Sequence, residues 1–257
     1  MAHFHLPHLF DDWDEISRLL RAATRVHLFL DFDGTLADFH VDPDRVRLGA
    51  NVRRALRRLV RHRSLRVIIV SGRRRATLSR HVRVPGVKLL GLYGWENGAE
   101  PHLSLGTARS LDAVRAALAD LPRKLPGIRL EDKTISLAFH FRGTTSPIRR
   151  RARRTIRSSV AQFQTHLHAL HGNDILEVVP RQVGGKGIAI RKAIGRARKA
   201  TLPIFLGDDL TDEPAFALLR KGITVLVGPR RRTKAHFALR GPKEVCRFLN
   251  RLEEELP

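Results

Sequence analysis

The residues best suited to chemistry are carboxylates that follow apolar runs of the chain. Asp31 and Asp33 come directly after the run Val26–Leu30, and Gly34 lets the backbone turn sharply after them. In an open α/β sheet, ligands bind beyond the carboxyl ends of the strands, so both carboxylates are expected at a binding edge. The alternative interpretation is an acidic turn, which is common where Asp precedes Gly.

A second acidic segment follows the apolar run Ile204–Leu206. It reads Gly207-Asp208-Asp209-Leu210-Thr211-Asp212-Glu213. Carboxylates at neighbouring strand ends repel one another unless a cation lies between them, and oxygen ligands suit Mg²⁺. We expect metal ligands at Asp31, Asp33 and Asp208, with Asp209 and Asp212 acting through water or from outside the ligand set. The alternative for Asp212 and Glu213 is that they are first-turn acids interacting with a helix dipole.

Groups suited to a phosphate lie between the two acidic segments. Ser71-Gly72-Arg73 follows the run Val67–Val70 and offers a hydroxyl, a flexible backbone and helix-start amides. Lys186 stands among glycines in Gly184-Gly185-Lys186-Gly187, where it can approach an anion and neutralise both a phosphate and an aspartate. This segment is not a P-loop, because the G-x-x-x-x-G-K-S/T pattern is missing.

The elements that must position these residues are short aliphatic strands separated by helices. The apolar runs are continuous rather than alternating, which is typical of a parallel sheet covered on both faces. They are Val26–Leu30, Val67–Val70, Leu89–Tyr93, Ile204–Leu206 and Ile223–Val227. The outer parts of the chain therefore predict a doubly wound, Rossmann-like α/β core over residues 1–106 and 181–257.

The middle of the chain has a different pattern. Ile128–Leu130 and Ile135–Phe141 predict a hairpin with a period of two, a long Arg-rich helix is expected from about Pro147 to Leu170, and a strand at Ile175–Val179. A sheet inserted within a parallel-sheet domain favours a lid, and we place this smaller α/β cap domain at residues 107–180.

Composition narrows the class of protein. The 257 residues are 42% hydrophobic, and the single Cys246 excludes an internal disulfide. No apolar run approaches the length of a membrane-spanning helix, and the acidic N-terminal region is unlike a signal peptide, so a cytoplasmic location and no membrane partner are expected. His3, His5 and His8 have spacings that fit a metal, but a ragged terminus before a helix around Ile16, Leu19 and Leu20 is the simpler interpretation.

The net charge of +23 invites a nucleic-acid interpretation. However, much of the excess is arginine on expected helical faces, and no RNP-type aromatic pattern, zinc finger or basic-zipper heptad accompanies it. Incidental surface charge and a functional contact with a polyanion both stay open, and nucleic acid is expected to bind only nonspecifically.

Taken in chain order, the four motifs resemble the haloacid dehalogenase superfamily. The order is Asp-x-Asp-Gly-Thr, a strand-end Ser, a Lys and Gly-Asp-Asp-x-x-Asp, over about residues 26–230. The long insertion before Lys186 resembles members with a type-2 α/β cap. Within these, the segments around Arg73, Asp208, Lys133 to Arg142, and Glu177 resemble the trehalose-6-phosphate phosphatase family. One departure is Gly94-Trp95-Glu96-Asn97, where that family usually carries a histidine-containing loop.

The resemblance implies a Mg²⁺-dependent hydrolase that releases phosphate from trehalose 6-phosphate, a small-molecule sugar phosphate. Asp31 would attack phosphorus and form an aspartyl-phosphate, and Asp33 would act as general acid and base, with Ser71 and Lys186 binding oxygens. The substrate-binding residues implied are Gly34, Thr35, Gly72, Arg73, Lys133, His140, Arg142 and Glu177. Two alternatives stay open: a related phosphatase acting on sucrose phosphate, mannosylglycerate phosphate or a hexose phosphate, and a nucleic-acid-binding protein on a phosphatase scaffold.

Overall fold

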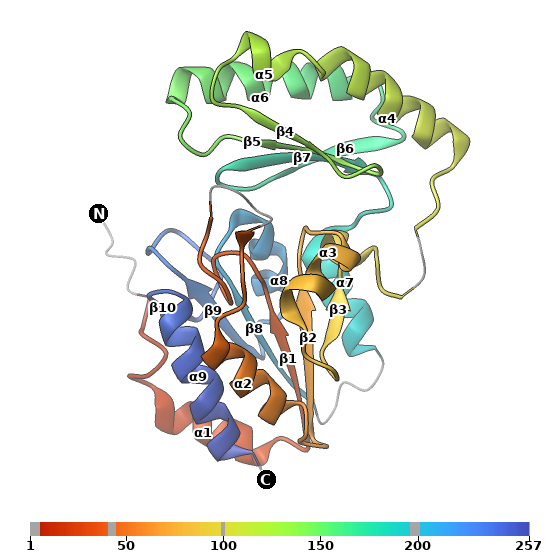
Figure 1. The fold of residues 1–257 in the computed structure, drawn as a ribbon. Helices are drawn as coiled ribbons and strands as arrows, with labels where there is room; N and C mark the ends of the chain where they lie inside the picture. Colours follow the sequence, from red (N-terminus) through yellow and green to blue (C-terminus); the bar gives the residue numbers. More distant parts are fainter. Residues whose placement is uncertain (1–5, 41–44, 99–100, 196–200, 257) are drawn as a thin grey trace. The chain divides into compact units, whose positions relative to one another are not determined.

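The computed structural model describes residues 6–40, 45–98, 101–195 and 201–256, and it divides into two compact units (Figure 1). The core unit comprises Met1–Gly98 and Gly185–Pro257, and the inserted unit comprises Ala99–Gly184. The inserted unit starts earlier than the sequence predicted: a boundary between residues 106 and 107 falls inside helix α4, Leu105–Leu118. A helix cannot be divided there because its backbone hydrogen bonds run across that point.

The core unit is built on a parallel six-stranded sheet of order β10-β9-β8-β1-β2-β3. Its strands are β1 (Arg25–Leu30), β2 (Leu65–Val70), β3 (Lys88–Leu90), β8 (Thr201–Gly207), β9 (Ile223–Val227) and β10 (Phe237–Leu239). The central strand β1 pairs with β2 on one side and with β8 on the other. The predicted parallel α/β core is therefore confirmed, and β1 and β8 end beside each other.

Helices cover both faces of this sheet. They are α1 (Trp13–Ala22), α2 (Ala50–Leu59), α3 (Arg75–Val82), α7 (Gly185–Ile194), α8 (Glu213–Leu218) and α9 (Pro242–Glu255). Leu28 and Leu30 of β1 pack in one core cluster with residues of α2 and α9, which run side by side in Figure 1. Phe29 points to the opposite face and packs with residues of α7 and α8. This alternation buries β1 from both sides, as its continuous apolar run predicted.

Two core strands differ from the sequence-based prediction. The run Leu89–Tyr93 is a strand only to Leu90, because a 3-10 turn follows at Leu92–Gly94 with positive φ angles at Leu92 and Tyr93. Strand β10 was not predicted, since three residues carry too little periodicity to be seen.

The N-terminal helix α1 is present, although Leu19 is 42% exposed and does not belong to its buried face. His8 lies 2.9 Å from Glu244. His3 and His5 lie outside the described residues, so the three-histidine hypothesis stays untested.

The inserted unit has an antiparallel sheet of order β4-β5-β7-β6. Its elements are α4, α5 (Leu121–Lys124), β4 (Arg129–Asp132), β5 (Leu137–His140), α6 (Ser146–Ala161), β6 (Leu167–His171) and β7 (Ile175–Pro180). The predicted hairpin is confirmed, with Arg129 opposite His140.

The long helix expected from Pro147 to Leu170 was wrong in its second half. It ends at Ala161, and residues 167–171 form β6 along β7. Leu167 and Ala169 lie on either side of His168, and this period of two suits a strand whose inward side chains reach the cluster under the sheet.

Among the residues that the structure describes, no helix is both long and apolar enough to cross a bilayer.

Candidate active site

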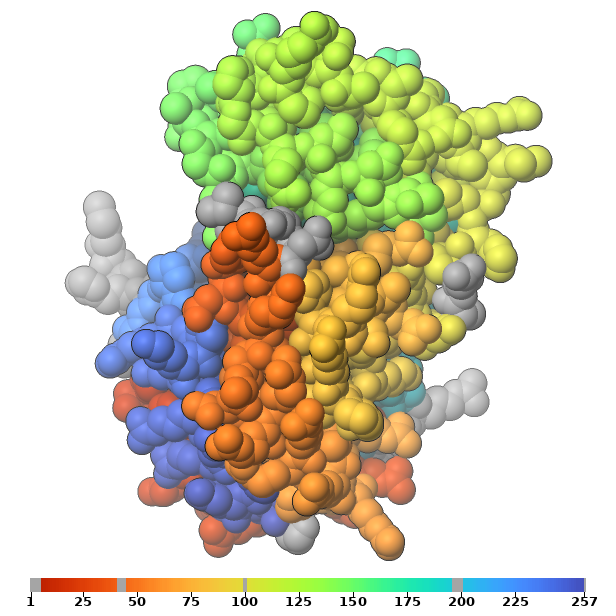
Figure 2. Space-filling model, viewed as in Figure 1, coloured from red at the N-terminus to blue at the C-terminus, as the bar shows by residue number. Residues whose placement is uncertain are grey.

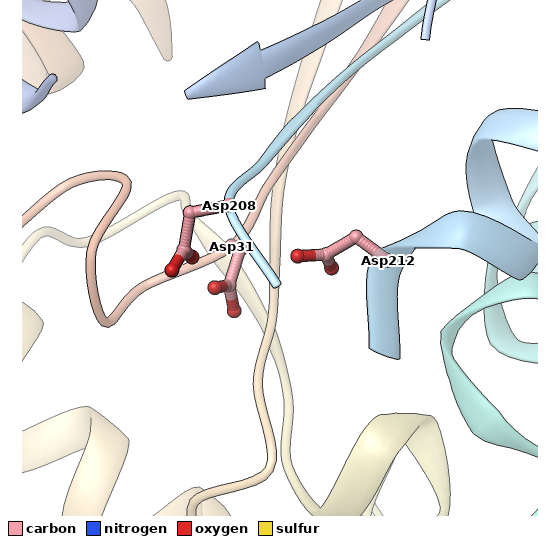
Figure 3. A group of neighbouring side chains, drawn as sticks. All are labelled: Asp31, Asp208 and Asp212. Carbon is pink, nitrogen blue, oxygen red and sulfur yellow. The ribbon is translucent and has the colours of Figure 1, made fainter. Parts of the chain in front are cut away.

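A cluster of carboxylates lies at the carboxyl end of the core sheet. Asp31 directly follows β1 and Asp208 directly follows β8, so the parallel pairing of these strands brings them together. Asp212 comes from the short turn Leu210–Asp212, and Figure 3 shows its side chain reaching toward the other two. One carboxylate oxygen from each lies within 4.8 Å of the others.

Lys186 supplies the positive charge nearest to this cluster. It stands in the first turn of α7, is buried, and places its Nζ 2.7 Å from Asp31 Oδ1 and 2.6 Å from Asp212 Oδ1. Burial by itself would lower the pKa of Lys186, but the charges of Asp212 and Asp31 raise it above its usual value. The ammonium therefore stays charged and orients both carboxylates.

One cation does not neutralise three carboxylates. Burial, followed by repulsion from Asp31 and Asp212, raises the pKa of Asp208 well above its usual value. Burial also raises the pKa of Asp212, although Lys186 opposes the shift. A divalent ion among these oxygens would offset the repulsion, and an all-oxygen donor set suits Mg²⁺. The residues present fit such an ion.

The Asp33 side chain is not part of this carboxylate cluster, and it pairs with Arg73. Its two oxygens accept hydrogen bonds from Arg73 Nε at 2.7 Å and Nη2 at 2.6 Å. The carboxylates brought together are therefore Asp31, Asp208 and Asp212, and not the predicted set of Asp31, Asp33 and Asp208. The sequence could not separate Asp33 from Asp212, because the difference depends on the turn that brings Asp212 back over the sheet edge.

Gly34 and Thr35 support the cluster from the β1 side. Gly34 has a φ of +84°, and a Cβ there would collide with the Asp208 carboxylate. Thr35 Oγ1 donates to Asp208 Oδ1 at 3.3 Å. Both residues, predicted to bind substrate, contact Asp208 and fix its carboxylate beside Asp31.

Ser71 and Gly72 lie at the carboxyl end of β2, the strand next to β1. Ser71 is buried, and its Oγ accepts a hydrogen bond from the Arg73 amide at 3.2 Å. A Cβ on Gly72 would lie 2.8 Å from the Tyr93 ring, so only glycine lets the turn after β3 pack this closely. The loop that carries Arg73 is thereby held against the sheet.

Two residues that hold segments beside the site, Glu96 and Arg231, were not predicted from the sequence. Glu96 is buried and binds the Arg74 guanidinium at 2.5 Å and the Arg75 amide, which fixes the start of α3. Arg231 donates to the Asp209 carbonyl at 2.9 Å and also pairs with Glu213. A lone Glu within a loop and one Arg in a run of arginines carry no sequence signal for these roles.

Asp209 lies beside the cluster rather than in it. Its amide donates to Asp212 Oδ2 at 2.9 Å, and its side chain caps the turn Leu210–Asp212. Its place outside the ligand set stays a prediction.

The predicted residues of the inserted unit form three separate ion-paired groups. Lys133 Nζ lies 3.0 Å from Glu177 Oε2, and Ser136 Oγ donates to Glu177 Oε1 at 2.7 Å. His140 pairs with Glu131 at 2.8 Å, and Arg142 lies 3.7 Å from Asp174. Glu177 is fully buried, and Lys133 and Ser136 hold its carboxylate.

The parallel sheet, the strand-end aspartates and the inserted antiparallel unit define a haloacid dehalogenase-like fold. A haloacid dehalogenase-like hydrolase from Bacteroides thetaiotaomicron has the same fold, with a TM-score of 0.60, 14% identity and coverage of 89% of this chain and 99% of that one. The C-terminal domain of trehalose-6-phosphate phosphatase from C. albicans superposes with a TM-score of 0.82, at 21% identity and 100% coverage of both chains.

The sequence model of trehalose-phosphatases matches residues 29–243, and the chain belongs to this family. A trehalose-phosphate phosphatase of Mycobacterium avium is 32% identical over 247 residues, covering 89% of this chain and 62% of the relative. A trehalose 6-phosphate phosphatase of Zea mays is 31% identical over 263 residues, covering 91% of this chain and 72% of the relative. The chain thus spans about 62% of the length of the mycobacterial protein.

Proposed function

We propose that this chain is a Mg²⁺-dependent phosphatase that hydrolyses trehalose 6-phosphate to trehalose and inorganic phosphate. The observation that carries the proposal is the Asp31 carboxylate, held by Lys186 at 2.7 Å beside Asp208 and Asp212. Membership of the trehalose-phosphatase family supports the substrate. The proposed ion is held by Asp31, Asp208 and Asp212, and when bound it supplies positive charge against the phosphoryl oxygens.

The first proposed step transfers the phosphoryl group to Asp31. A carboxylate oxygen of Asp31 forms a bond to phosphorus as the bond from phosphorus to the sugar oxygen breaks, and Asp33 gives a proton to that leaving oxygen. Lys186 and the Ser71 hydroxyl bind the phosphoryl oxygens during transfer. Sugar is released, and an aspartyl-phosphate stays on the protein.

The second proposed step regenerates Asp31. Asp33 accepts a proton from a water molecule whose oxygen bonds to phosphorus, and the bond between phosphorus and the Asp31 oxygen breaks. Inorganic phosphate leaves, Asp31 returns as a carboxylate and Asp33 is protonated again. The two hydrogen bonds from Arg73 hold the Asp33 carboxylate in place for both proton transfers.

The inserted unit is proposed to select the sugar. Trehalose presents hydroxyl groups, which are recognised by fixed donors and acceptors. Lys133, His140, Arg142 and Glu177 offer such groups in the inserted unit. Because Glu177 also neutralises the buried Lys133, its substitution must be judged by folding as well as by activity.

The test compares phosphate release from trehalose 6-phosphate, sucrose 6-phosphate, glucose 6-phosphate and mannosylglycerate phosphate. We expect kcat/KM to be highest for trehalose 6-phosphate and to vanish in excess EDTA. Asp31→Asn keeps the shape of the nucleophile but removes its charge, and should lower kcat by about four orders of magnitude or more. A preference for another sugar phosphate would keep the mechanism and refute the substrate, whereas full activity of Asp31→Asn would refute the mechanism.

Glu177→Gln tests the specificity role. The variant should lose far more activity on trehalose 6-phosphate than on an aryl phosphate, with a melting temperature that shows a folded protein. Equal losses on both substrates would mean that Glu177 acts only in the stability of the inserted unit.

A further inference from the structure

A cavity lined by arginines lies in the core unit, between α2 and the end of α3. The cavity has a volume of about 580 Å³ and is lined by Arg47, Leu48, Arg53, Arg80, His81 and Arg83. Hydrogen bonds join its two walls: Arg53 Nε donates to the Val82 carbonyl at 3.4 Å, and an Arg47 nitrogen lies 3.2 Å from His81 Nδ1. Figure 2 shows the orange segment around residues 45–60 lying against the gold segment around residues 75–90.

Among the described residues, the lining is strongly cationic and includes no carboxylate. Leu48 and His81 are buried, while the guanidinium groups surround them. Within the described part of the chain, Arg80 donates a hydrogen bond to the Thr77 hydroxyl, and Arg83 donates one to the Arg80 carbonyl. Each guanidinium has five N–H donors, so most donors at these two residues are available to a ligand.

The backbone conformation of Arg83 is a second observation that supports a ligand site. It ends α3 in the left-handed conformation, with a φ of +50°, where glycine is the favoured residue. A long side chain at such a position is uncommon and carries a conformational cost. The cost is consistent with a role for the Arg83 side chain in the cavity that it lines.

We propose that this cavity binds a small anion with two phosphate groups. Guanidinium groups match phosphate oxygens with paired hydrogen bonds, and four of them offset the charge of a diphosphate. The volume falls within the range of small-molecule pockets, which is about 300–1,000 Å³. The proposal does not depend on the phosphatase reaction, because the cavity shares no lining residue with the acidic cluster.

The cavity is nevertheless a neighbour of the candidate active site. The His81 ring lies 6.2 Å from the Phe32 ring, and the Arg73 guanidinium lies 5.5 Å from the centre of that same ring. Binding must therefore be assigned to one of the two sites by variants of each.

The experiment titrates the full chain with inorganic pyrophosphate in a calorimeter, in EDTA so that no divalent ion bridges the anion to the acidic cluster. We expect Arg80→Gln/Arg83→Gly to weaken the Kd at least tenfold. Arg83→Gly alone should weaken it too without lowering the melting temperature, because glycine suits the backbone there. The matched control is Arg150→Gln/Arg154→Gln, which removes the same charge from exposed positions of α6.

Three outcomes would overturn the proposal. In the first, the cavity variants bind pyrophosphate as the wild type does. In the second, the control variant loses as much affinity as Arg80→Gln/Arg83→Gly, which would mean attraction to overall charge. In the third, binding is unchanged in the cavity variants' isotherms but altered by Asp31→Asn, which would assign the anion to the acidic cluster. Trehalose 6-phosphate hydrolysis is measured separately on the same samples, so the failure of one proposal leaves the other assessable.

Discussion

At the scale of single residues, Arg73 determines where the Asp33 carboxylate lies. Two hydrogen bonds from one guanidinium fix the plane of the carboxylate, which a single point charge cannot do. Asp33 is the proposed acid and base, so its orientation toward the reacting oxygen decides whether a proton can be transferred. We therefore propose that Arg73, which the sequence predicted to bind substrate, acts as a positioning residue for Asp33.

We expect Arg73→Lys to keep the positive charge but lose the paired geometry. Because misplacement of a catalytic group by about 1 Å costs about 100-fold, kcat should fall about 10- to 100-fold with little change in KM. Steady-state kinetics with trehalose 6-phosphate measures both constants. Arg61→Lys, at an exposed position, is the control. A rise in KM with unchanged kcat would instead return Arg73 to the role of a substrate ligand.

Glu131 is the residue for which the structure gives a clear dependence on pH. Burial would raise its pKa, but the hydrogen bond from His140 and the charges of Lys133, His140 and Arg129 lower it from 4.5 to about 2. The folded state therefore holds Glu131 ionised at pH values where the unfolded chain already binds a proton. Its stabilising contribution is complete above pH 4.5 and is lost as the pH falls toward about 2.

Glu131→Gln should remove this part of the acid sensitivity. The melting temperature of the wild type should fall more steeply than that of the variant when the pH is lowered from about 5 to about 3. Asp120→Asn, at an exposed carboxylate that lies 3.0 Å from Arg123, serves as the comparison and should follow the wild type. If the melting temperatures of the wild type and Glu131→Gln fell equally with pH, the lowered pKa of Glu131 would be contradicted.

At the scale of elements, α6 separates its arginines from its apolar face. Ala152, Ile156 and Val160 are buried and share one face, which packs in the cluster beneath the antiparallel sheet. Arg150, Arg151, Arg154 and Arg157 are exposed. The apolar face therefore packs this helix into the inserted unit. Arg149 and Arg153 of the same helix add contacts with Asp174 and the Gly172 carbonyl.

Ile156→Ala should leave a cavity under the sheet and lower the free energy of unfolding by about 2–5 kcal/mol. Arg154→Ala, at an exposed position two residues before Ile156, should change it by less than about 0.5 kcal/mol. Urea unfolding of the full chain, followed by circular dichroism, measures both. Similar losses for the two variants would show that the arginine face packs against something.

At the scale of the whole molecule, the net charge of +23 should attract an anionic substrate before it binds. Raising KCl from about 50 to 500 mM shortens the Debye length and should lower kcat/KM several-fold, while kcat changes little. Stopped assays of phosphate release at a series of salt concentrations test this. An equal fall in kcat would place the salt effect in the chemical step.

The same charge makes weak binding of nucleic acid expected. Fluorescence anisotropy with a short DNA duplex should show binding that disappears on adding salt, because released counterions supply most of its free energy. Tight binding at about 150 mM salt would instead favour a specific contact with a polyanion.

The sequence by itself determined the parallel core and the meeting of Asp31, Asp208, Lys186 and Ser71 at one edge of it. Continuous apolar runs specify buried strands, and the carboxyl ends of parallel strands share an edge, so local patterns were sufficient here. The hairpin at β4 and β5 was visible for the same reason, because its period of two is local.

Only the tertiary structure decided which groups touch across long separations in the chain. It pairs Asp33 with Arg73 and brings Asp212 into the cluster; it also turns residues 167–171 into a strand and buries Glu177 against Lys133. The sequence shows an aspartate in the same way whether its carboxylate faces a guanidinium or another carboxylate. Its partner is set by loop conformation and packing, which depend on contacts between residues that the sequence pattern leaves far apart.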